Sequence, residues 1–226
     1  MVRVERLSYN FGRNWAVKDV SFTVEKGEFV FLTGASGAGK TTLLRLLYGA
    51  LPVTRGLAEV AGFTLNRLKK RSLPDLRRNV GVVFQDFKIL PRRTVFDNVA
   101  LALEVRGIPR QVRERRVRAI LRALGLENKS YSLCGHLSGG EQQRVAIARS
   151  MVGQPSVILA DEPTGNLDLD LSLHLMSVFK QFNDFGATIL MATHNRDILA
   201  CVPEARVIHL KDGGIDGAAP EPEAVS

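Results

Sequence analysis

The sequence contains little cysteine and no long apolar run. Cys134 and Cys201 are its only cysteines, and no Cys-x-x-Cys or Cys/His spacing surrounds them, which argues against a disulfide framework and a zinc site. The longest apolar runs, such as residues 29–32 and 157–160, are far shorter than the roughly 20 residues that cross a bilayer. No apolar stretch of signal-peptide type opens the chain. We therefore expect a protein of the reducing cytosol, and if it works at a membrane, another molecule must hold it there.

The remaining composition is that of an ordinary globular protein. Hydrophobic residues make up 45% and charged residues 24% of the 226 residues, which excludes a disordered or collagen-like body and favours one large domain, or a core with a subdomain. The 31 Lys and Arg against 23 Asp and Glu give a net charge of +8. This excess favours nucleic acid, nucleotide phosphates or an anionic membrane surface as partners, with a merely solubilising surface as the alternative.

The apolar pattern predicts an α/β fold. Strands are expected at residues 2–7, 16–24, 28–33, 56–63, 80–85, 157–160, 188–192 and 206–210. One helix is expected to begin at Lys40, and another is expected at residues 171–182. Because strands and helices alternate after Ser138, we expect a mostly parallel sheet with helices on its faces. The stretch from Asp212 is rich in Gly, Pro and Glu, and residues 216–226 are predicted to be a disordered tail.

Residues 91–125 have a different character. Their helical pattern places one apolar face among many arginines, and Gly125 is a stop signal. The apolar face consists of Val117, Ile120, Leu121 and Leu124. The arginines favour either a solvated face over an ordinary core stripe or docking to an acidic or membrane-associated partner.

A phosphate-binding loop follows the expected strand at residues 28–33. The segment fits the pattern G-x-x-x-x-G-K-[ST] and consists of Gly34, Ala35, Ser36, Gly37, Ala38, Gly39, Lys40 and Thr41. Its small residues let backbone N–H groups surround a phosphate at the start of a helix. We expect Lys40 to reach the β and γ phosphates, Thr41 to bind Mg²⁺ through its hydroxyl, and Thr42 to donate to the α phosphate.

Two acids follow a second buried strand. Asp161 and Glu162 come directly after residues 157–160, at the edge where open α/β sheets bind ligands. Triphosphate hydrolysis needs a carboxylate near the metal and a group that polarises water. We therefore assign Asp161 to Mg²⁺, acting through a bound water or Thr41, and Glu162 to the attacking water.

The segment LSGGEQQ at residues 137–143 has two interpretations. Ser138 and Glu141 have the spacing of a helix capping box, which is a purely structural role. Gly139 and Gly140 also permit a close backbone approach to an anion.

Taken together, the phosphate loop, LSGGEQQ, LADEPTGNLD and MATHN resemble the nucleotide-binding subunit of ABC transporters, over nearly the whole chain up to about residue 215. The resemblance implies a P-loop NTPase of ABC type at residues 1–215, with a mostly parallel sheet, an antiparallel β subdomain and a helical subdomain at about residues 88–155. It implies ATP and Mg²⁺ as cofactors. It also implies a head-to-tail homodimer in which Ser138, Gly139, Gly140 and Glu141 close over ATP bound to the other copy.

The same resemblance assigns further residues. Gln85 matches the glutamine that contacts Mg²⁺ and the attacking water, and His194 matches the histidine that contacts the γ phosphate and orients Glu162. Asp168, with Asn166 and Leu167, matches a loop that crosses the dimer interface. Phe11 fits the position of the aromatic residue that stacks on adenine, with Tyr9 as the second choice and core packing as the competing role of both.

Finer likeness comes from RRTVFDNVAL at residues 92–101 and FNDFGATILMATHN at residues 182–195. These segments resemble the cell-division ATPases of the family, and the alternative is an ATPase of lipoprotein release or macrolide efflux. The cell-division resemblance implies an FtsX-type integral membrane permease and the division machinery as partners. It implies a peripheral location at the cytoplasmic face of the inner membrane, through that partner, with no specific nucleic acid. A salt-dependent affinity for DNA would instead support a nucleic-acid binder.

Overall fold

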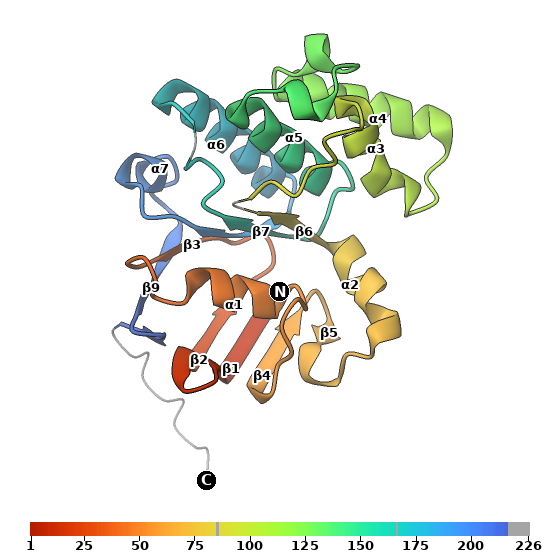
Figure 1. The fold of residues 1–226 in the computed structure, drawn as a ribbon. Coiled ribbons are helices and arrows are strands. Elements are labelled where there is room, and N and C mark those ends of the chain that lie inside the picture. Colours follow the sequence, from red (N-terminus) through yellow and green to blue (C-terminus); the bar gives the residue numbers. More distant parts are fainter. Residues whose placement is uncertain (85, 166, 217–226) are drawn as a thin grey trace.

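The computed structural model describes residues 1–84, 86–165 and 167–216, which form two sheets and a group of helices (Figure 1). The first sheet is antiparallel and has the strand order β2-β1-β4-β5. Its strands are β1 (Val2–Phe11), β2 (Asn14–Val24), β4 (Arg55–Val60) and β5 (Phe63–Thr64). This sheet matches the expected antiparallel β subdomain.

The second sheet has the order β10-β9-β3-β8-β7-β6, and all of its described pairs are parallel except β9 with β10. Its strands are β3 (Phe29–Thr33), β6 (Val80–Val83), β7 (Val157–Asp161), β8 (Thr188–Ala192), β9 (Arg206–Lys211) and β10 (Gly214–Ile215). Because β3, β7 and β8 are neighbours, their carboxyl ends meet at one edge. The predicted α/β class with a mostly parallel sheet is confirmed.

The central strands are apolar throughout because both faces of their sheet are covered. In β3, Phe29 and Phe31 belong to one hydrophobic core and Val30 and Leu32 to the other. Parallel sheets buried on both faces have such continuous apolar runs. One core lies between the two sheets and includes α1 (Lys40–Leu47). The other lies under the remaining large helices.

Those helices occupy the upper part of Figure 1. They are α3 (Val95–Glu104), α4 (Arg110–Ala123), α5 (Gly139–Met151), α6 (Leu169–Asp184) and the short α7 (Arg196–Ala200). The predicted apolar face of α4 is buried, as Val117, Ile120 and Leu121 all pack into the core. No helix among residues 1–84, 86–165 and 167–216 combines the length and the apolar character that crossing a bilayer requires.

Three features of the fold differ from what the sequence indicated. The single strand expected at residues 56–63 is two strands, because Ala61 and Gly62 adopt positive φ values of 52° and 82° and reverse the chain. The helix α2 (Leu73–Asn79), with Pro74 in its first turn, was not expected. Finally, β10 lies within the Gly-rich stretch that follows Asp212, where backbone pairing with β9 replaces the missing apolar pattern.

Candidate active site

The phosphate loop joins β3 to α1 as predicted, and its glycines are required by close backbone approaches. Gly34 has φ 141°, and a Cβ there would lie 2.2 Å from the backbone oxygen of Leu210. Gly39 has φ 104°, and a Cβ there would lie 2.2 Å from the backbone oxygen of Ala16. A larger residue at either position would displace the loop from the strands that support it. The neighbouring strands β9 and β2 therefore fix the loop conformation.

Lys40 points back into the loop. Its Nζ donates to the backbone oxygens of Gly34, at 2.7 Å, and of Ala35, at 3.1 Å. The N-cap of α1 is Gly39, which supplies no side-chain cap. The first N–H groups of α1 are therefore left for another acceptor, and with the positive end of the helix dipole they form a site for an anion.

A cleft of about 410 Å³ brings most of the predicted residues together. Ala16 lines it beside the whole phosphate loop from Gly34 to Thr42, and Asp161, Glu162 and His194 complete the wall. The side chains come from the ends of β2, β3, β7 and β8. This is the arrangement expected when ligands bind at the carboxyl edge of an open sheet.

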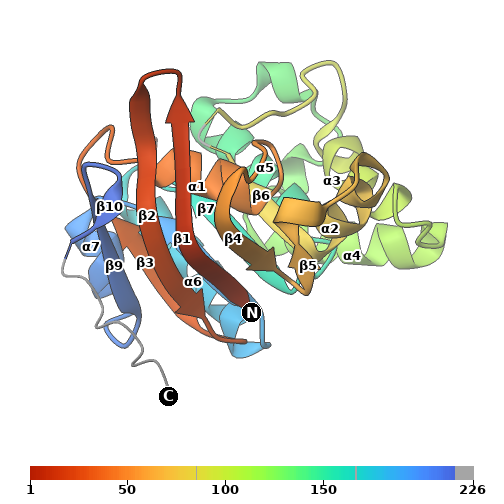
Figure 2. The same ribbon diagram turned by 90° about the horizontal axis from the view of Figure 1, so that it is seen from below.

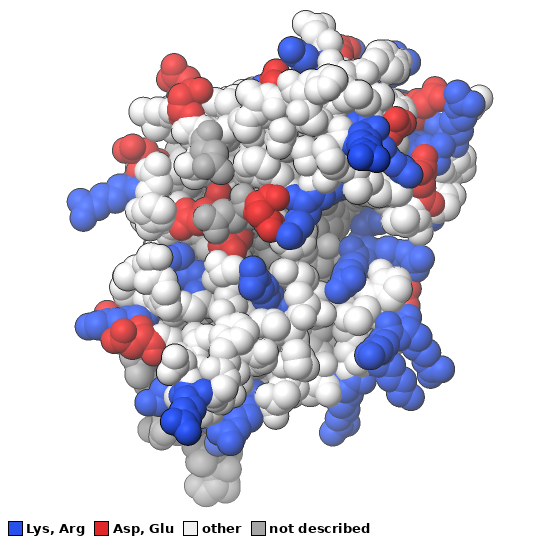
Figure 3. Space-filling model, in the orientation of Figure 1, with Lys and Arg blue, Asp and Glu red and all other residues white. Residues whose placement is uncertain are grey.

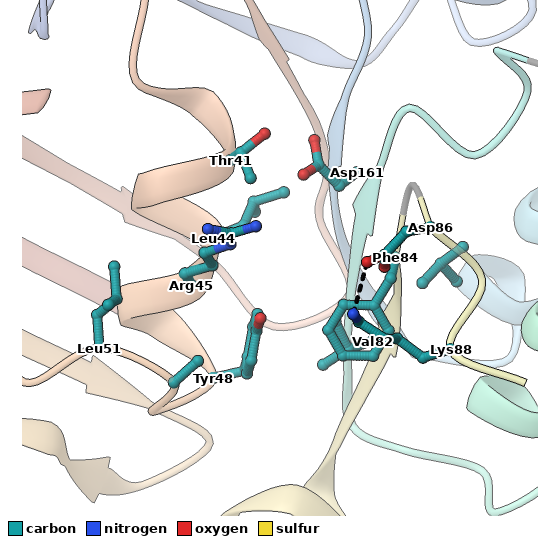
Figure 4. Close-up of a pocket in the computed structure, with 12 residues that line it drawn as sticks. Thr41, Leu44, Arg45, Tyr48, Leu51, Val82, Phe84, Asp86, Lys88 and Asp161 are labelled. Atoms are coloured by element: carbon teal, nitrogen blue, oxygen red, sulfur yellow. Dashed lines mark ion pairs between the residues drawn. The ribbon is translucent and has the colours of Figure 1, made fainter. Parts of the chain in front are cut away.

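Asp161 ends β7 and is 8% exposed. Burial raises the pKa of its carboxyl, a hydrogen bond from Thr41 acts in the opposite direction, and the charge of Glu162 raises the pKa further. Figure 4 shows Thr41 and Asp161 facing each other from α1 and β7. A hydroxyl and a carboxylate oxygen are ligands that suit Mg²⁺, which is usually held by one or two protein groups together with substrate phosphates. The pair therefore fits the metal of a nucleotide triphosphate.

Glu162 and His194 are in direct contact. His194 Nδ1 lies 2.7 Å from Glu162 Oε1, and the backbone N–H of Glu162 donates to Ala192 at 3.0 Å. Glu162 has φ 47°, a left-handed conformation that costs a non-glycine residue free energy and is found at functional sites. The carboxylate is mostly buried, and the imidazole is 74% exposed. The histidine is thus placed to orient the carboxylate.

The LSGGEQQ segment begins α5 with a complete capping box. The N–H of Glu141 donates to Ser138 Oγ at 3.3 Å, and the N–H of Ser138 donates to Glu141 Oε2 at 2.8 Å. This second bond is the main reason that the pKa of Glu141 is lowered. The structural interpretation of the segment is therefore confirmed. None of Ser138, Gly139, Gly140 and Glu141 lines the cleft around the phosphate loop of the described chain.

The other predicted residues lie outside the cleft or outside the described residues. Phe11 ends β1, is 53% exposed and meets Tyr9 edge-on with 5.1 Å between ring centroids, but it is not among the cleft-lining residues. Asp168 caps α6 by accepting from the N–H of Leu171 at 2.8 Å. Gln85 and Asn166 lie outside the described residues.

Sequence reasoning missed two buried amides, one of which contacts the loop that follows Glu162. Gln143 is 1% exposed and donates to the backbone oxygen of Pro163 at 2.9 Å, so it ties α5 to the loop after Glu162. Asn98, in α3, is fully buried. In both cases the available signal was a lone amide on an otherwise apolar helical face.

Asn98 ties the segment before α3 to that helix. Its Oδ1 accepts from Leu90 N at 2.8 Å, and its Nδ2 lies 3.0 Å from Leu90 O and 2.9 Å from Thr94 O. The same nitrogen lies 3.1 Å from Cys134 Sγ. Burial raises the pKa of the Cys134 thiol to about 11, which indicates a packing role rather than a reactive one.

A second cavity of about 410 Å³ adjoins the cleft and shares Thr41 and Asp161 with it. Figure 4 shows Arg45 and Tyr48 further along the α1 side. The opposite wall includes Phe84, whose ring meets that of Tyr48 edge-on with 5.5 Å between centroids. The cavity thus extends from Thr41 and Asp161 to the residues that follow β6.

A groove of about 650 Å³ continues from this cavity and shares Tyr48 and Phe84 with it. One side of the groove is formed by α2, including Arg77, and the other by α3 and α5, including Ala102 and Arg149. We call it the inter-subdomain groove, since it separates the sheets from the group of helices around α3. The cleft, the cavity and the groove are contiguous through shared residues.

The comparisons with known proteins agree with this geometry. The family described as ABC transporter matches residues 17–165. The chain is 49% identical over 200 residues to the cell division ATP-binding protein FtsE of Streptococcus pneumoniae serotype 2, which covers 88% of this chain and 86% of that protein. It is 45% identical over 218 residues to FtsE of Escherichia coli K12, with 96% and 98% covered.

Two solved structures share the fold over nearly the whole chain. Both are dimeric structures of the ATP-binding cassette MJ0796, and one of them is a post-hydrolysis state bound to ADP and Pi. Their TM-scores are 0.88 and 0.89, at 32% and 33% identity, and each covers 96% of this chain and 97% of the other. With the family match and the assembled cleft, these likenesses show that the chain belongs to the ABC transporter family, as an ATPase.

Proposed function

We propose that this chain is the ATPase of a bacterial cell-division assembly, in which two copies close around two ATP molecules and drive an FtsX-type membrane partner. The relatives named FtsE, at 45% and 49% identity, support the division role. The chain would then be peripheral at the cytoplasmic face of the inner membrane, held there by its partner. Its closure would transmit a conformational change that controls septal peptidoglycan hydrolysis.

The observation that carries the dimeric mechanism is the position of Ser138. The loop with Lys40 and the carboxylate of Glu162 line one cleft, whereas Ser138 lies outside it. A γ phosphate in that cleft would therefore meet cationic and metal-binding groups of its own chain on one side. On the other side it would not meet Ser138 of its own chain. A second copy, placed head to tail, would supply Ser138 and the N-terminus of its α5 as anion-binding donors. The dimeric cassettes of similar fold support this arrangement.

In the proposed reaction the residues of one cleft have separate tasks. ATP with Mg²⁺, when bound, supplies the γ-phosphoryl group and the leaving group. Lys40 would exchange its contacts with the loop carbonyls for the β and γ phosphate oxygens, and Thr41 and Asp161 would hold Mg²⁺. Glu162 accepts the proton of the attacking water at its carboxylate. General-base catalysis of this kind typically raises the rate by about 10²- to 10⁴-fold.

The remaining proposed roles depend on contacts that ATP or a second copy would complete. His194 holds Glu162 through the 2.7 Å contact and faces the cleft, where it would also meet the γ phosphate. Phe11 would stack on adenine from the exposed end of β1. Gln85 would contact Mg²⁺ and water, and Asp168 would contact the other copy.

The contiguous cavities suggest how the partner senses the nucleotide. The inter-subdomain groove reaches Tyr48 and Phe84, and the next cavity reaches Thr41 and Asp161. A partner segment seated in the groove would therefore touch Tyr48 and Phe84, which line the same cavity as Thr41 and Asp161. Closure of the cleft can in this way change the shape of the groove without any long-range relay.

A mixing experiment tests the composite site. Lys40→Ala disables the phosphate loop and Ser138→Arg disables the segment that the other copy supplies, so each variant alone should lose turnover. In a mixture, each heterodimer has one site with neither substitution, and roughly one quarter of the sites are intact if the copies pair at random. ATPase activity should therefore return on mixing. Wild-type activity of Ser138→Arg alone would refute the composite site.

A second experiment tests the division role. The chain, carrying Glu162→Gln to hold ATP, is purified from native membranes with its bound partner, and the integral membrane protein is identified. Recovery of an FtsX-type protein supports the proposal. Recovery of a lipoprotein-releasing or macrolide-efflux permease would assign the chain to that transport function instead.

A further inference from the structure

A strongly basic segment forms one rim of the inter-subdomain groove. Residues 65–79 hold six Lys and Arg residues against Asp75, a net charge of +5 in a chain whose net charge is +8. The six are Arg67, Lys69, Lys70, Arg71, Arg77 and Arg78, and all of them are exposed. We call these residues the basic rim.

The fold holds the basic rim in place rather than leaving it as a loose tail. Leu65 and Leu76 are buried in the core between the sheets and anchor the two ends of the segment. Figure 3 shows Lys and Arg side chains gathered at the lower right, over α2 and the segment before it. Figure 2 shows α2 on the side of the molecule opposite to β9 and β10. The positive charge of the basic rim thus lies on one side of the molecule.

Most of this charge is unneutralised. Within the residues that the structure describes, Arg78 pairs with Asp75 at 2.8 Å, and the other five cations of the basic rim have no ion pair. In α4, Arg110, Arg113 and Arg122 each pair with a glutamate, and among the described residues only Arg115, Arg116 and Arg118 of that helix have no ion pair. The basic rim is therefore the more available site for an external anion.

The position of the basic rim indicates which anion it meets. Pro74, Arg77 and Arg78 line the inter-subdomain groove as well as belonging to α2. If a cytoplasmic segment of the membrane partner sits in this groove, the rim of the groove lies on the side of the chain that meets the bilayer. This step rests on the proposed function.

We propose that the basic rim binds the anionic lipid headgroups of the membrane surface directly. Each Lys or Arg near such a surface strengthens binding by roughly five-fold, and the attraction falls off within a Debye length. The segment contains no aromatic residue, so it offers no stacking platform for single-stranded nucleic acid. The contact is electrostatic and superficial, and it orients the ATPase so that the groove faces its partner.

Vesicle co-sedimentation without any partner protein tests the proposal. The full chain should bind phosphatidylcholine vesicles that contain about one third phosphatidylglycerol, and should not bind pure phosphatidylcholine vesicles. The variant Lys69→Glu, Lys70→Glu, Arg71→Glu should bind the anionic vesicles more than about 100-fold more weakly, because it reverses three charges. The neutral variant Lys69→Gln, Lys70→Gln, Arg71→Gln should show a smaller loss, of about 100-fold, and thermal unfolding checks that both variants fold.

The matched control carries the same change in charge at a distance from the groove. Lys18, Lys26 and Lys211 are exposed residues of the β2 and β9 side, and their joint replacement by Glu should leave vesicle binding within a few-fold of wild type. An equal loss in the control would mean that net charge alone acts and would overturn the proposal. Binding to a DNA duplex but not to anionic vesicles would also overturn it.

This test separates the two proposals. If the wild-type chain binds anionic vesicles through the basic rim but co-purifies with a permease of another class, the lipid contact stands and the division role fails. If the chain co-purifies with an FtsX-type protein but binds neither kind of vesicle, the division role stands and the lipid contact fails.

Discussion

His194 Nδ1 lies 2.7 Å from Glu162 Oε1, although the two residues are 32 positions apart in the sequence. The contact exists because β7 and β8 are parallel neighbours whose carboxyl ends meet. Glu162 continues the pairing by donating its N–H to Ala192, and its φ of 47° then turns the carboxylate into the cleft. A strained backbone and a histidine together determine where the carboxylate lies.

Glu162→Gln should lower kcat for ATP hydrolysis by about 10²- to 10⁴-fold while ATP binding persists. The amide keeps the size of the side chain but cannot accept a proton from water. Steady-state phosphate release and equilibrium nucleotide binding check the two halves of this prediction. Glu204→Gln, which removes an exposed carboxylate paired with Lys180, is the control and should leave kcat unchanged. An unchanged kcat in Glu162→Gln would remove the residue from the role of base.

Asp161→Asn should raise the Tm of the nucleotide-free protein at pH 7 by a few degrees and abolish Mg²⁺-dependent activity. The pKa of Asp161 is raised by burial, so its charged form destabilises the folded state at every pH above that raised pKa. The gain in Tm should therefore shrink as the pH is lowered through the raised pKa, where wild-type Asp161 takes up a proton. Thermal unfolding across pH measures this, and a lower Tm for the variant at pH 7 would contradict it.

Gly39→Ala should impair folding stability and ATP binding far more than Gly12→Ala does. Both glycines have positive φ, so both substitutions carry a backbone penalty of about 1 kcal/mol. Only at Gly39 does the added Cβ meet a backbone oxygen, at 2.2 Å from Ala16, whereas nothing lies within 4 Å at Gly12. Urea unfolding and nucleotide titration of the two variants separate the collision from the backbone penalty. Equal effects would show that the loop can shift to accommodate a methyl group.

Asn98→Ala should lower the free energy of unfolding by about 2–4 kcal/mol. The substitution leaves the part-buried N–H and C=O of Leu90 without the buried amide that both now share. Asn79→Ala is the control, because Asn79 is exposed and its side chain bonds to Asp75 O at the surface. That change should stay within about 0.5 kcal/mol. Urea denaturation of both variants measures these free energies of unfolding. A loss of stability in Asn98→Ala as small as that in Asn79→Ala would mean that water replaces the amide.

The phosphate loop and the acids after β7 could be predicted because each has a local cause. A phosphate-binding loop needs small residues followed by the start of a helix, and residues 34–41 have that pattern. Asp161 follows four apolar residues of a buried strand. Their meeting in one cleft follows from the parallel sheet. The direct contact of Glu162 with His194 was expected from the family resemblance, since a lone histidine carries no such information.

Other features depend on contacts between distant segments and leave little trace in the sequence. The two residues of β10 are held by pairing with β9, within a stretch whose composition resembles that of a disordered tail. The amide of Asn98 is one polar residue on an apolar face until the fold brings Leu90 and Cys134 beside it. The groove is formed where α2, α3 and α5, which are far apart in the sequence, come together in the fold.

The carbonyl of Ala16 has a wider consequence. It belongs to the antiparallel sheet, yet it fixes the backbone at Gly39 in the loop of the other sheet. A slip of β2 by one residue would move that oxygen and reshape the nucleotide pocket without altering a single residue of the loop. A design that moves this pocket to a new scaffold must therefore include β2. A ligand that displaces β2 would inhibit the enzyme without entering the pocket.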